Sequence, residues 1–175
     1  MAQKFFPQKV KLVISIIYQN KALCEKVVPM LETQFSPLDF KSEVYSFSSF
    51  SVYYDEEMGN NLQRIFVTFS DLVSQDALAH IKSKTDLLER EFIQKGRRTI
   101  NIDPGILTLK NFVLATHKDY THRIYLHDGV YADLTLVYTN RSFQSLPWTY
   151  PDYGSPTLIQ LFNTLRENYK ERVLP

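Results

Sequence analysis

The sequence predicts a single α+β domain over residues 1–175, with a ferredoxin-like core at about 10–103 and a C-terminal extension at about 104–171. The core is the split β-α-β-β-α-β arrangement, because four strand-like stretches and two helical stretches follow one another in that order. In this arrangement the first and third strands are central, and the second and fourth lie at the edges. The first and third stretches are apolar on both faces, whereas the other two alternate between apolar and polar residues. The extension is expected to hold a hairpin and a helix.

The composition narrows the classes of partner. Apolar residues make up 44% and charged residues 22% of the chain, which is typical of a water-soluble globular protein. The net charge of +1 gives no general attraction for nucleic acid or for an anionic membrane, so we expect neither as a partner. Cys24 is the single cysteine, which excludes an intramolecular disulfide and a cysteine-based zinc site. The apolar run 12–18 is far shorter than the roughly 20 residues that span a bilayer. These features favour a cytoplasmic location.

The first elements follow from apolar spacing. Residues 10–18 are β-branched and apolar on both faces, which predicts a central strand. Asn20 can cap a following helix that Ser36-Pro37 ends, and Pro29 inside it is expected to kink or divide it. Residues 38–47 alternate again, which predicts a strand with one face in water.

The second half of the core repeats this order. Residues 48–61 are expected to form a short helix or an ordered loop, and residues 64–69 a strand that is apolar on both faces. Ser74 can cap the clearest helix of the chain, and Gly96 is placed to end it. Residues 97–103 predict the fourth strand.

The extension is expected to contain one ambiguous stretch, a hairpin, an aromatic arm and a last helix. Asp103-Pro104 is typical of a helix start, so residues 106–115 predict a short buried helix, with a strand over 112–116 as the alternative. Residues 122–126 and 130–138 predict a hairpin with a three-residue loop and a left-handed Gly129. That register places Arg123 opposite Asp133, Ile124 opposite Ala132 and Tyr125 opposite Tyr131. Residues 146–153 predict an extended aromatic arm, and Ser155-Pro156 opens a last helix at about 158–169.

Five motifs occur in order along the chain: YYDEEMG at 53–59, NIDPG at 101–105, LATxK ending at Lys118, RIYLxDGxYAD at 123–133 and PWTYPDY at 147–153. Together they resemble a bacterial family of uncharacterised proteins of about this length, one of the domains of unknown function. The resemblance spans about residues 12–166 and implies no established activity. Some members of that family carry a GTP-binding label, but this chain has no G-x-x-x-x-G-K-[ST] phosphate loop. Asp133 stands where the family leads us to expect glutamate.

The charged residues within these motifs form the first candidate site: Asn101, Asp103, Lys118, Arg123 and Asp133. The two cations could grip a phosphate or a carboxylate, while Asn101 would orient the ligand. Asp103 and Asp133 could hold a magnesium ion or act as acid and base. The structural alternative is that Asp103 only caps a helix and that Arg123 and Asp133 form a cross-strand ion pair.

Other residues are weaker candidates. Glu57 could join Asp103 at a metal site, although the adjacent Glu56 would point away from it on a helix. Tyr131 and Trp148 are ligand-binding candidates, and Trp148, Tyr150 and Tyr153 could stack on a base or a sugar, or could simply cover the body of the protein. The histidines at 117, 122 and 127 have neither helical nor single-face strand spacing, which disfavours a zinc site.

Three hypotheses about function follow. The first is that the protein binds or acts on a phosphorylated or nucleotide-like small molecule through a mixed-charge pocket. The second is a single-stranded RNA-binding module, by analogy with the predicted fold, although an RNP-like pattern is absent from the sequence. The third is a non-catalytic partner-binding protein. No nucleophile–base pair stands out, so the sequence leaves open whether the protein is an enzyme.

Overall fold

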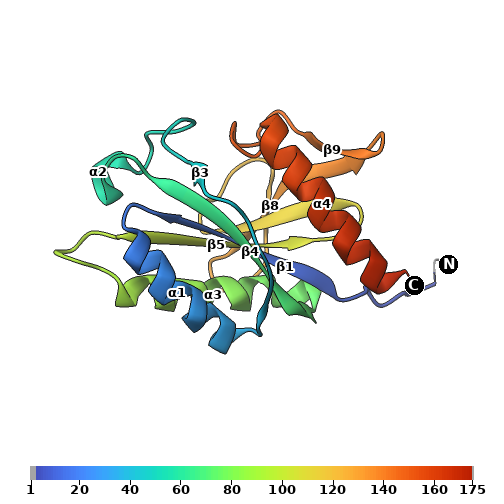
Figure 1. The fold of residues 1–175 in the computed structure, drawn as a ribbon. Helices are drawn as coiled ribbons and strands as arrows, with labels where there is room; N and C mark the ends of the chain where they lie inside the picture. The colour runs from blue at the N-terminus through green and yellow to red at the C-terminus, as the bar shows by residue number, and fades with distance from the viewer. Residues whose placement is uncertain (1–2, 175) are drawn as a thin grey trace.

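The computed structural model describes residues 3–174 (Figure 1). The strands are β1 (Val10–Tyr18), β2 (Leu38–Lys41), β3 (Tyr45–Ser46), β4 (Gln63–Val73), β5 (Ile100–Leu107), β6 (Asn111–Thr116), β7 (Arg123–Tyr125), β8 (Tyr131–Thr139) and β9 (Ser142–Ser145). The helices are α1 (Lys21–Gln34), α2 (Asp55–Met58), α3 (Leu78–Glu91), preceded by the 3₁₀ turn η1 (Gln75–Ala77), and α4 (Pro156–Val173). The chain is therefore an α+β protein, as the sequence predicts.

One nine-stranded sheet runs through both halves of the chain. Its strand order is β2-β4-β1-β5-β6-β8-β7, with β3 also paired to β4 and β9 to β8, and each recorded pairing is antiparallel. Helices α1 and α3 lie on one face of the sheet and α4 lies on the other (Figure 1). Because both faces of β1 are covered, every one of its residues is buried. This explains why its sequence is apolar without alternation.

Helix α1 begins as predicted and runs through its proline. The side chain of Asn20 accepts a hydrogen bond from the backbone N–H of Ala22 at 2.9 Å, which makes it the N-cap. Pro29 does not divide the helix, which is continuous over 14 residues. Burial of Val27 and Leu31 against the sheet holds the helix together on both sides of the proline.

The fourth predicted strand is not an edge strand, and no helix follows Asp103. Asp103 and Pro104 lie inside β5, which pairs with β1 along its length and with β6 from Gly105 to Leu107. Proline has no N–H to donate. Pro104 is paired with Ile14 of β1 but stands one residue before the pairing with β6 begins, so β6 supplies no partner there. Gly105 admits the ring of Phe112, since a Cβ there would lie 2.5 Å from the ring's Cζ.

The C-terminal hairpin has the predicted register. Arg123 pairs with Asp133, Ile124 with Ala132 and Tyr125 with Tyr131. Gly129 has a φ of 72°, and the backbone N–H of Leu126 donates to the carbonyl of Val130 at 2.9 Å, so three residues form the loop.

The prediction of an extended aromatic arm at residues 146–153 is wrong. Residues 147–154 form successive turns, in which the N–H of Thr149 donates to the carbonyl of Leu146 and the N–H of Gly154 to that of Tyr150. These turns place Asp152 and Tyr153 in the interior. Ser155 then caps α4, as predicted, by accepting a hydrogen bond from the N–H of Leu158.

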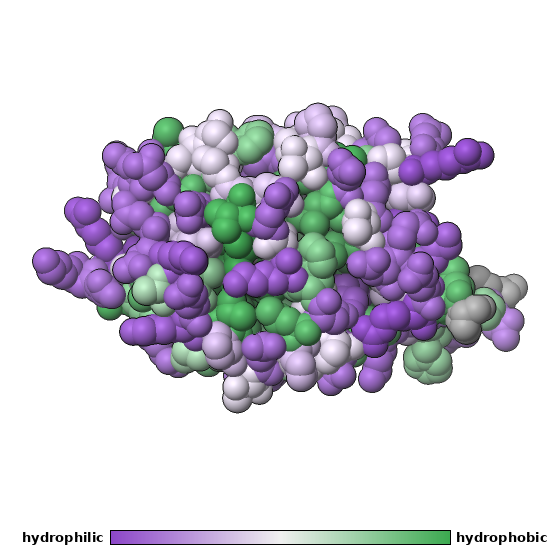
Figure 2. All heavy atoms as spheres, viewed as in Figure 1, coloured by the Kyte–Doolittle hydropathy of each residue, from purple (hydrophilic) through white to green (hydrophobic). Residues whose placement is uncertain are grey.

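The surface in Figure 2 is covered largely by hydrophilic residues, with hydrophobic ones gathered near the middle of the view. Within residues 3–174, no helix has both the length and the apolar character needed to cross a membrane.

Candidate functional site

The candidate site is a cleft between β5 and β6. The two strands pair only as far as Gly105 and Leu114, although β5 extends on to Ile100 and β6 to Thr116. A cavity of about 560 Å³ lies where they separate. Its other walls come from the segment around α2 and from the turn at 150–153. We call this cavity the β5–β6 cleft.

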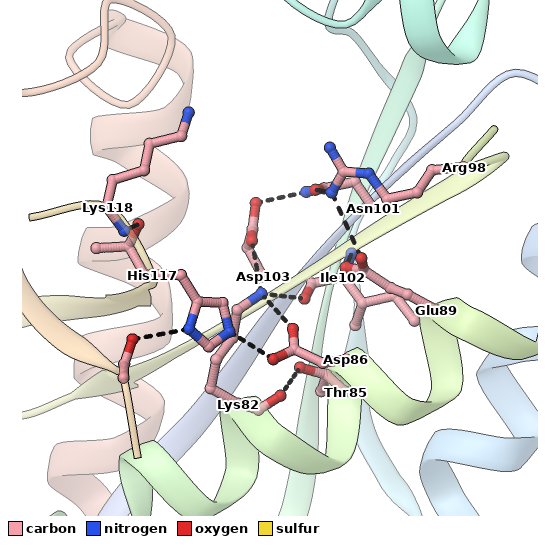
Figure 3. A network of polar contacts seen from close by, with 12 residues as sticks. Lys82, Thr85, Asp86, Glu89, Arg98, Asn101, Ile102, Asp103, His117 and Lys118 are labelled. Carbon is pink, nitrogen blue, oxygen red and sulfur yellow. Dashed lines mark hydrogen bonds and ion pairs between the residues drawn. The ribbon is translucent and has the colours of Figure 1, made fainter. Parts of the chain in front are cut away.

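Two side chains of α3 take the place of a strand partner at the open edge of β5. Glu89 Oε1 accepts a hydrogen bond from the backbone N–H of Ile102 at 2.6 Å, and Lys82 Nζ donates to the carbonyl of Ile102 at 3.4 Å (Figure 3). The backbone groups of Ile102 are thereby satisfied in the interior. Because these side chains replace the missing strand partner, β6 can separate from β5 and leave the cleft open.

Asp103 and Asn101 stand on the floor of the cleft within a charged network (Figure 3). Lys82 Nζ lies 3.3 Å from Asp103 Oδ1, and Asn101 Nδ2 donates to the other carboxylate oxygen. Arg98 Nη1 donates to Asn101 Oδ1 at 2.9 Å. Its Nε and Nη2 donate to Glu57 at 2.7 and 2.6 Å, so the Glu57 carboxylate is held in a fork. The network fixes the direction of Asp103.

The network perturbs the acidity of its members. Burial raises the pKa of Glu89 to about 7, even though Lys82 and Arg98 oppose the shift. The hydrogen bond from Arg98 lowers the pKa of Glu57. Burial lowers the pKa of Lys82, but attraction to Asp103, Glu89 and Asp86 outweighs it, so the pKa is raised. Lys82 is therefore a cation at neutral pH.

His117 extends the network along the wall of the cleft. Its Nδ1 lies 2.8 Å from the carbonyl oxygen of Gly129, and its Nε2 lies 2.6 Å from Asp86 Oδ2. A carbonyl and a carboxylate both accept hydrogen bonds, so the geometry favours protons on both ring nitrogens. The hydrogen bond to Asp86 raises the pKa of His117 in agreement with this.

This geometry predicts a pH-dependent contribution to stability. A raised folded-state pKa means that the contribution of His117 is complete below the unfolded value of about 6.5 and is lost as pH rises through the folded value. The difference in unfolding free energy between the parent and His117→Gln should therefore be largest near pH 6 and should shrink by pH 9. Because the imidazole is about half exposed, the difference should not exceed about 1 kcal/mol.

Urea titrations at the two pH values measure this difference. His80→Gln is the matched control, since His80 is exposed on the same helix and none of the hydrogen bonds within residues 3–174 involves its side chain. A difference for His117→Gln that grows with pH would contradict the assignment of a cationic imidazole.

Asp133 belongs to a second, buried cluster in the wall of the cleft. Its Oδ2 accepts from Arg123 Nε at 2.8 Å and lies 3.2 Å from His122 Nε2. The remaining Arg123 nitrogens donate to the carbonyl of Lys118 and to the hydroxyl of Tyr150, each at 3.0 Å. Arg123 therefore positions two walls of the cleft and is not a free anion clamp. Both Asp133 and Arg123 are committed to structure.

The cleft gathers some of the predicted residues and leaves out others. Asn101, Asp103, Lys118, Asp133 and Glu57 line it. Arg123, Tyr131 and Trp148 are not among its lining residues. The Trp148 ring stacks on His122 with centroids 4.8 Å apart and its Nε1 donates to the carbonyl of Leu134, while Tyr131 packs against Tyr125.

Sequence reasoning missed Lys82 and the role of Arg98. Lys82 is only 6% exposed and follows Ile81 within the buried side of α3. One signal could have identified it: a lysine next to the apolar seam of a helix is expected to be buried, and a buried lysine requires partners. Within residues 3–174, no three His, Cys, Asp or Glu side chains are grouped so that they could hold a metal ion. Both oxygens of Glu57 are already engaged by Arg98.

One known family matches the chain. The family described as "Domain of unknown function (DUF4416)" matches residues 8–169. The chain belongs to this family. Comparisons with curated proteins and with solved structures gave no match. The DUF4416 match runs from just before β1 to near the end of α4, so all walls of the cleft lie within the family domain.

Proposed function

We propose that this DUF4416 domain binds a phosphorylated or nucleotide-like small molecule in the β5–β6 cleft. The observation that carries the proposal is the position of Lys118. The other cations that line the cleft are each paired with a carboxylate: Arg64, Lys82, Arg98 and His117. Lys118 is exposed, and no carboxylate of residues 3–174 lies within 4.0 Å of its Nζ. Its ammonium instead contacts the hydroxyl of Tyr53 at 2.7 Å.

The remaining lining supports an aromatic or sugar-bearing ligand. Phe50, Tyr53, Tyr54 and Tyr150 contribute ring surface to the cleft. Aromatic side chains can stack on a nucleobase or cover the face of a sugar. The cavity volume of about 560 Å³ falls within the range of small-molecule sites.

Asp103 is the carboxylate that we assign to chemistry or to ligand orientation. It is partly exposed, with 28% of its side-chain surface accessible, and it is aimed by Lys82 and Asn101. Asp133 is a weaker candidate, because its side chain is 4% exposed and is bound by Arg123. Asp103 is also the residue through which a magnesium ion would act, if one accompanies a phosphate. A cytoplasmic location is part of the proposal, and a free buried Cys24 agrees with it.

We also propose that the first half of the chain has the ferredoxin-like, split β-α-β-β-α-β arrangement. The order β2-β4-β1-β5 and the antiparallel pairing of each neighbouring pair support this proposal. The placement of α1 and α3 on one face supports it as well. The later strands β6 to β9 then continue the same sheet beyond β5 and supply the second wall of the cleft.

Thermal melting with ligand panels tests the binding proposal. Nucleotides, sugar phosphates and short RNAs are added with and without magnesium to the parent, to Lys118→Ala and to Lys110→Ala. Lys110 is an exposed lysine in the turn between β5 and β6, far from the open end of the cleft. We expect a phosphorylated small molecule to raise the Tm of the parent and of Lys110→Ala but not of Lys118→Ala. A shift by RNA alone, or a shift that Lys118→Ala retains, would overturn the proposal.

A further inference from the structure

The hydrogen bonds around Lys118 identify two further donors that face the cleft. Lys118 Nζ lies 2.7 Å from the hydroxyl oxygen of Tyr53 and 4.1 Å from the centre of its ring. An ammonium group only donates hydrogen bonds, so the Tyr53 oxygen must be the acceptor. The hydroxyl proton of Tyr53 is then directed away from Lys118 and is available to a ligand. Tyr53 lines the cleft and is 64% exposed, so the proton can be reached.

Tyr150, from the turn at 150–153, is in the same situation. Arg123 Nη2 donates to its hydroxyl oxygen at 3.0 Å, and a guanidinium has no acceptor. The Tyr150 hydroxyl proton is therefore also directed away from the cation and is available to a ligand. Tyr150 lines the cleft, and 41% of its surface is exposed. A phenol that accepts a hydrogen bond from a cation is polarised and becomes a stronger donor.

One guanidinium ties these groups into a unit. Arg123 binds the Tyr150 hydroxyl through Nη2 and the carbonyl of Lys118 through Nη1, while Asp133 holds its Nε. Lys118 in turn holds Tyr53. The cleft thus presents one ammonium and two phenol protons from three separate segments of the chain. Asp133 and Arg123, although occupied, serve the site by setting the positions of these donors.

We infer that the ligand of the cleft carries a terminal phosphate monoester, which is bound by Lys118 together with the hydroxyl groups of Tyr53 and Tyr150. This inference rests on the proposed function and specifies the chemical class of the ligand. A phosphate monoester offers three terminal oxygens and up to two negative charges, which matches three donors that approach from different walls. A carboxylate and a phosphodiester each offer two such oxygens and a single charge, so two of the three donors must share one oxygen and the ammonium meets a smaller charge.

Binding measurements on phenylalanine variants test this inference. Phenylalanine keeps the ring and removes only the hydroxyl, so Tyr53→Phe and Tyr150→Phe are matched probes. Tyr125→Phe is the control, because Tyr125 is exposed on β7 and does not line the cleft. Calorimetric titration uses adenosine 5′-monophosphate, its 3′,5′-cyclic diester, glucose 6-phosphate and glucuronate. The first two compounds differ in phosphate class, and the last two differ in phosphate against carboxylate.

The expected result is saturable binding of at least one monoester by the parent and by Tyr125→Phe. Each cleft variant should bind that monoester about 10-fold more weakly or worse, since a hydrogen bond to a charged group is lost. The corresponding diester or carboxylate should bind the parent at least about 10-fold more weakly, because it carries less negative charge and cannot give each donor an oxygen of its own. Equal binding of monoester and diester, or unchanged affinity in both cleft variants, would overturn the inference.

The outcomes also separate this inference from the proposed function. If Lys118→Ala loses binding while both phenylalanine variants keep the affinity of the parent, the cleft is a ligand site without phenol donors. If the cyclic diester binds the parent and no monoester does, the inference fails and the proposed function stands. If no phosphorylated compound binds the parent, both fail.

Discussion

Replacing Asp152 with alanine should lower the free energy of unfolding by about 3–5 kcal/mol, because it leaves a buried arginine without its counter-charge. Asp152 forms an ion pair with Arg64 Nη1, and the two side chains are only 7% and 6% exposed. The Arg64 guanidinium lies over three aromatic rings, at 4.7 Å from Phe47, 5.6 Å from Phe66 and 5.1 Å from Tyr153. The rings and the low exposure of the guanidinium limit how far water can replace the lost carboxylate.

The same pair anchors the turn that carries Tyr150 to the cleft. Arg64 is on β4 and Asp152 is 88 residues later, so the ion pair joins the sheet to the turn. We therefore expect Asp152→Ala to weaken ligand binding as well as folding. Denaturant titration measures the loss of folding stability, and Asp128→Ala, on the exposed hairpin loop, is the control.

The paired variant Arg64→Met/Asp152→Leu isolates the cause of the loss. Replacing both members of a buried ion pair by apolar residues of similar volume often restores stability, because no unpaired charge is left. We expect the double variant to be more stable than Asp152→Ala alone. A loss below about 1 kcal/mol in Asp152→Ala would mean that the pair is more hydrated than its burial indicates.

Replacing Phe162 with alanine should cost about 3–5 kcal/mol through loss of burial and formation of a cavity. Phe162 lies on α4, is completely buried and meets four other rings across the face of the sheet. The closest is Phe112, with ring centres 4.5 Å apart. Because Phe112 also covers Gly105, the cavity would form under the strands that lead into the cleft.

Guanidinium titration of Phe162→Ala measures this loss, and Glu171→Ala on the exposed side of α4 is the control. We expect the control to remain within about 0.5 kcal/mol of the parent. If the free energy of unfolding of Phe162→Ala were within about 1 kcal/mol of that of the parent, this ring cluster would not be what holds α4 on the sheet.

Local sequence signals predicted the hairpin because its register depends on neighbouring residues alone. Gly129 fixes the loop, and alternation places Ile124 opposite Ala132. The element after Asp103 could not be predicted in the same way, since Asp-Pro is the local signature of a helix start. The strand pairs of β5 with β1, some 90 residues earlier, override that signature.

The candidate site shows the same division. Lys118 and Asp103 were predicted because their motifs are conspicuous, and both line the cleft. The commitment of Arg123 to Tyr150 could not be predicted, since the two residues are 27 positions apart and meet only through the turns at 147–154. The bond between Arg98 and Glu57 spans 41 positions and depends on where α2 comes to lie.

The central claim is that the β5–β6 cleft is a binding site for a phosphorylated small molecule. Its most direct test is a ¹H–¹⁵N chemical-shift titration with the monoester that gives the largest Tm shift. We predict that the perturbed amides cluster at residues 53–57, at 116–118 and at 150–153, which surround the cleft. Perturbations confined to β7 or to α4, or none at saturating ligand, would contradict the claim.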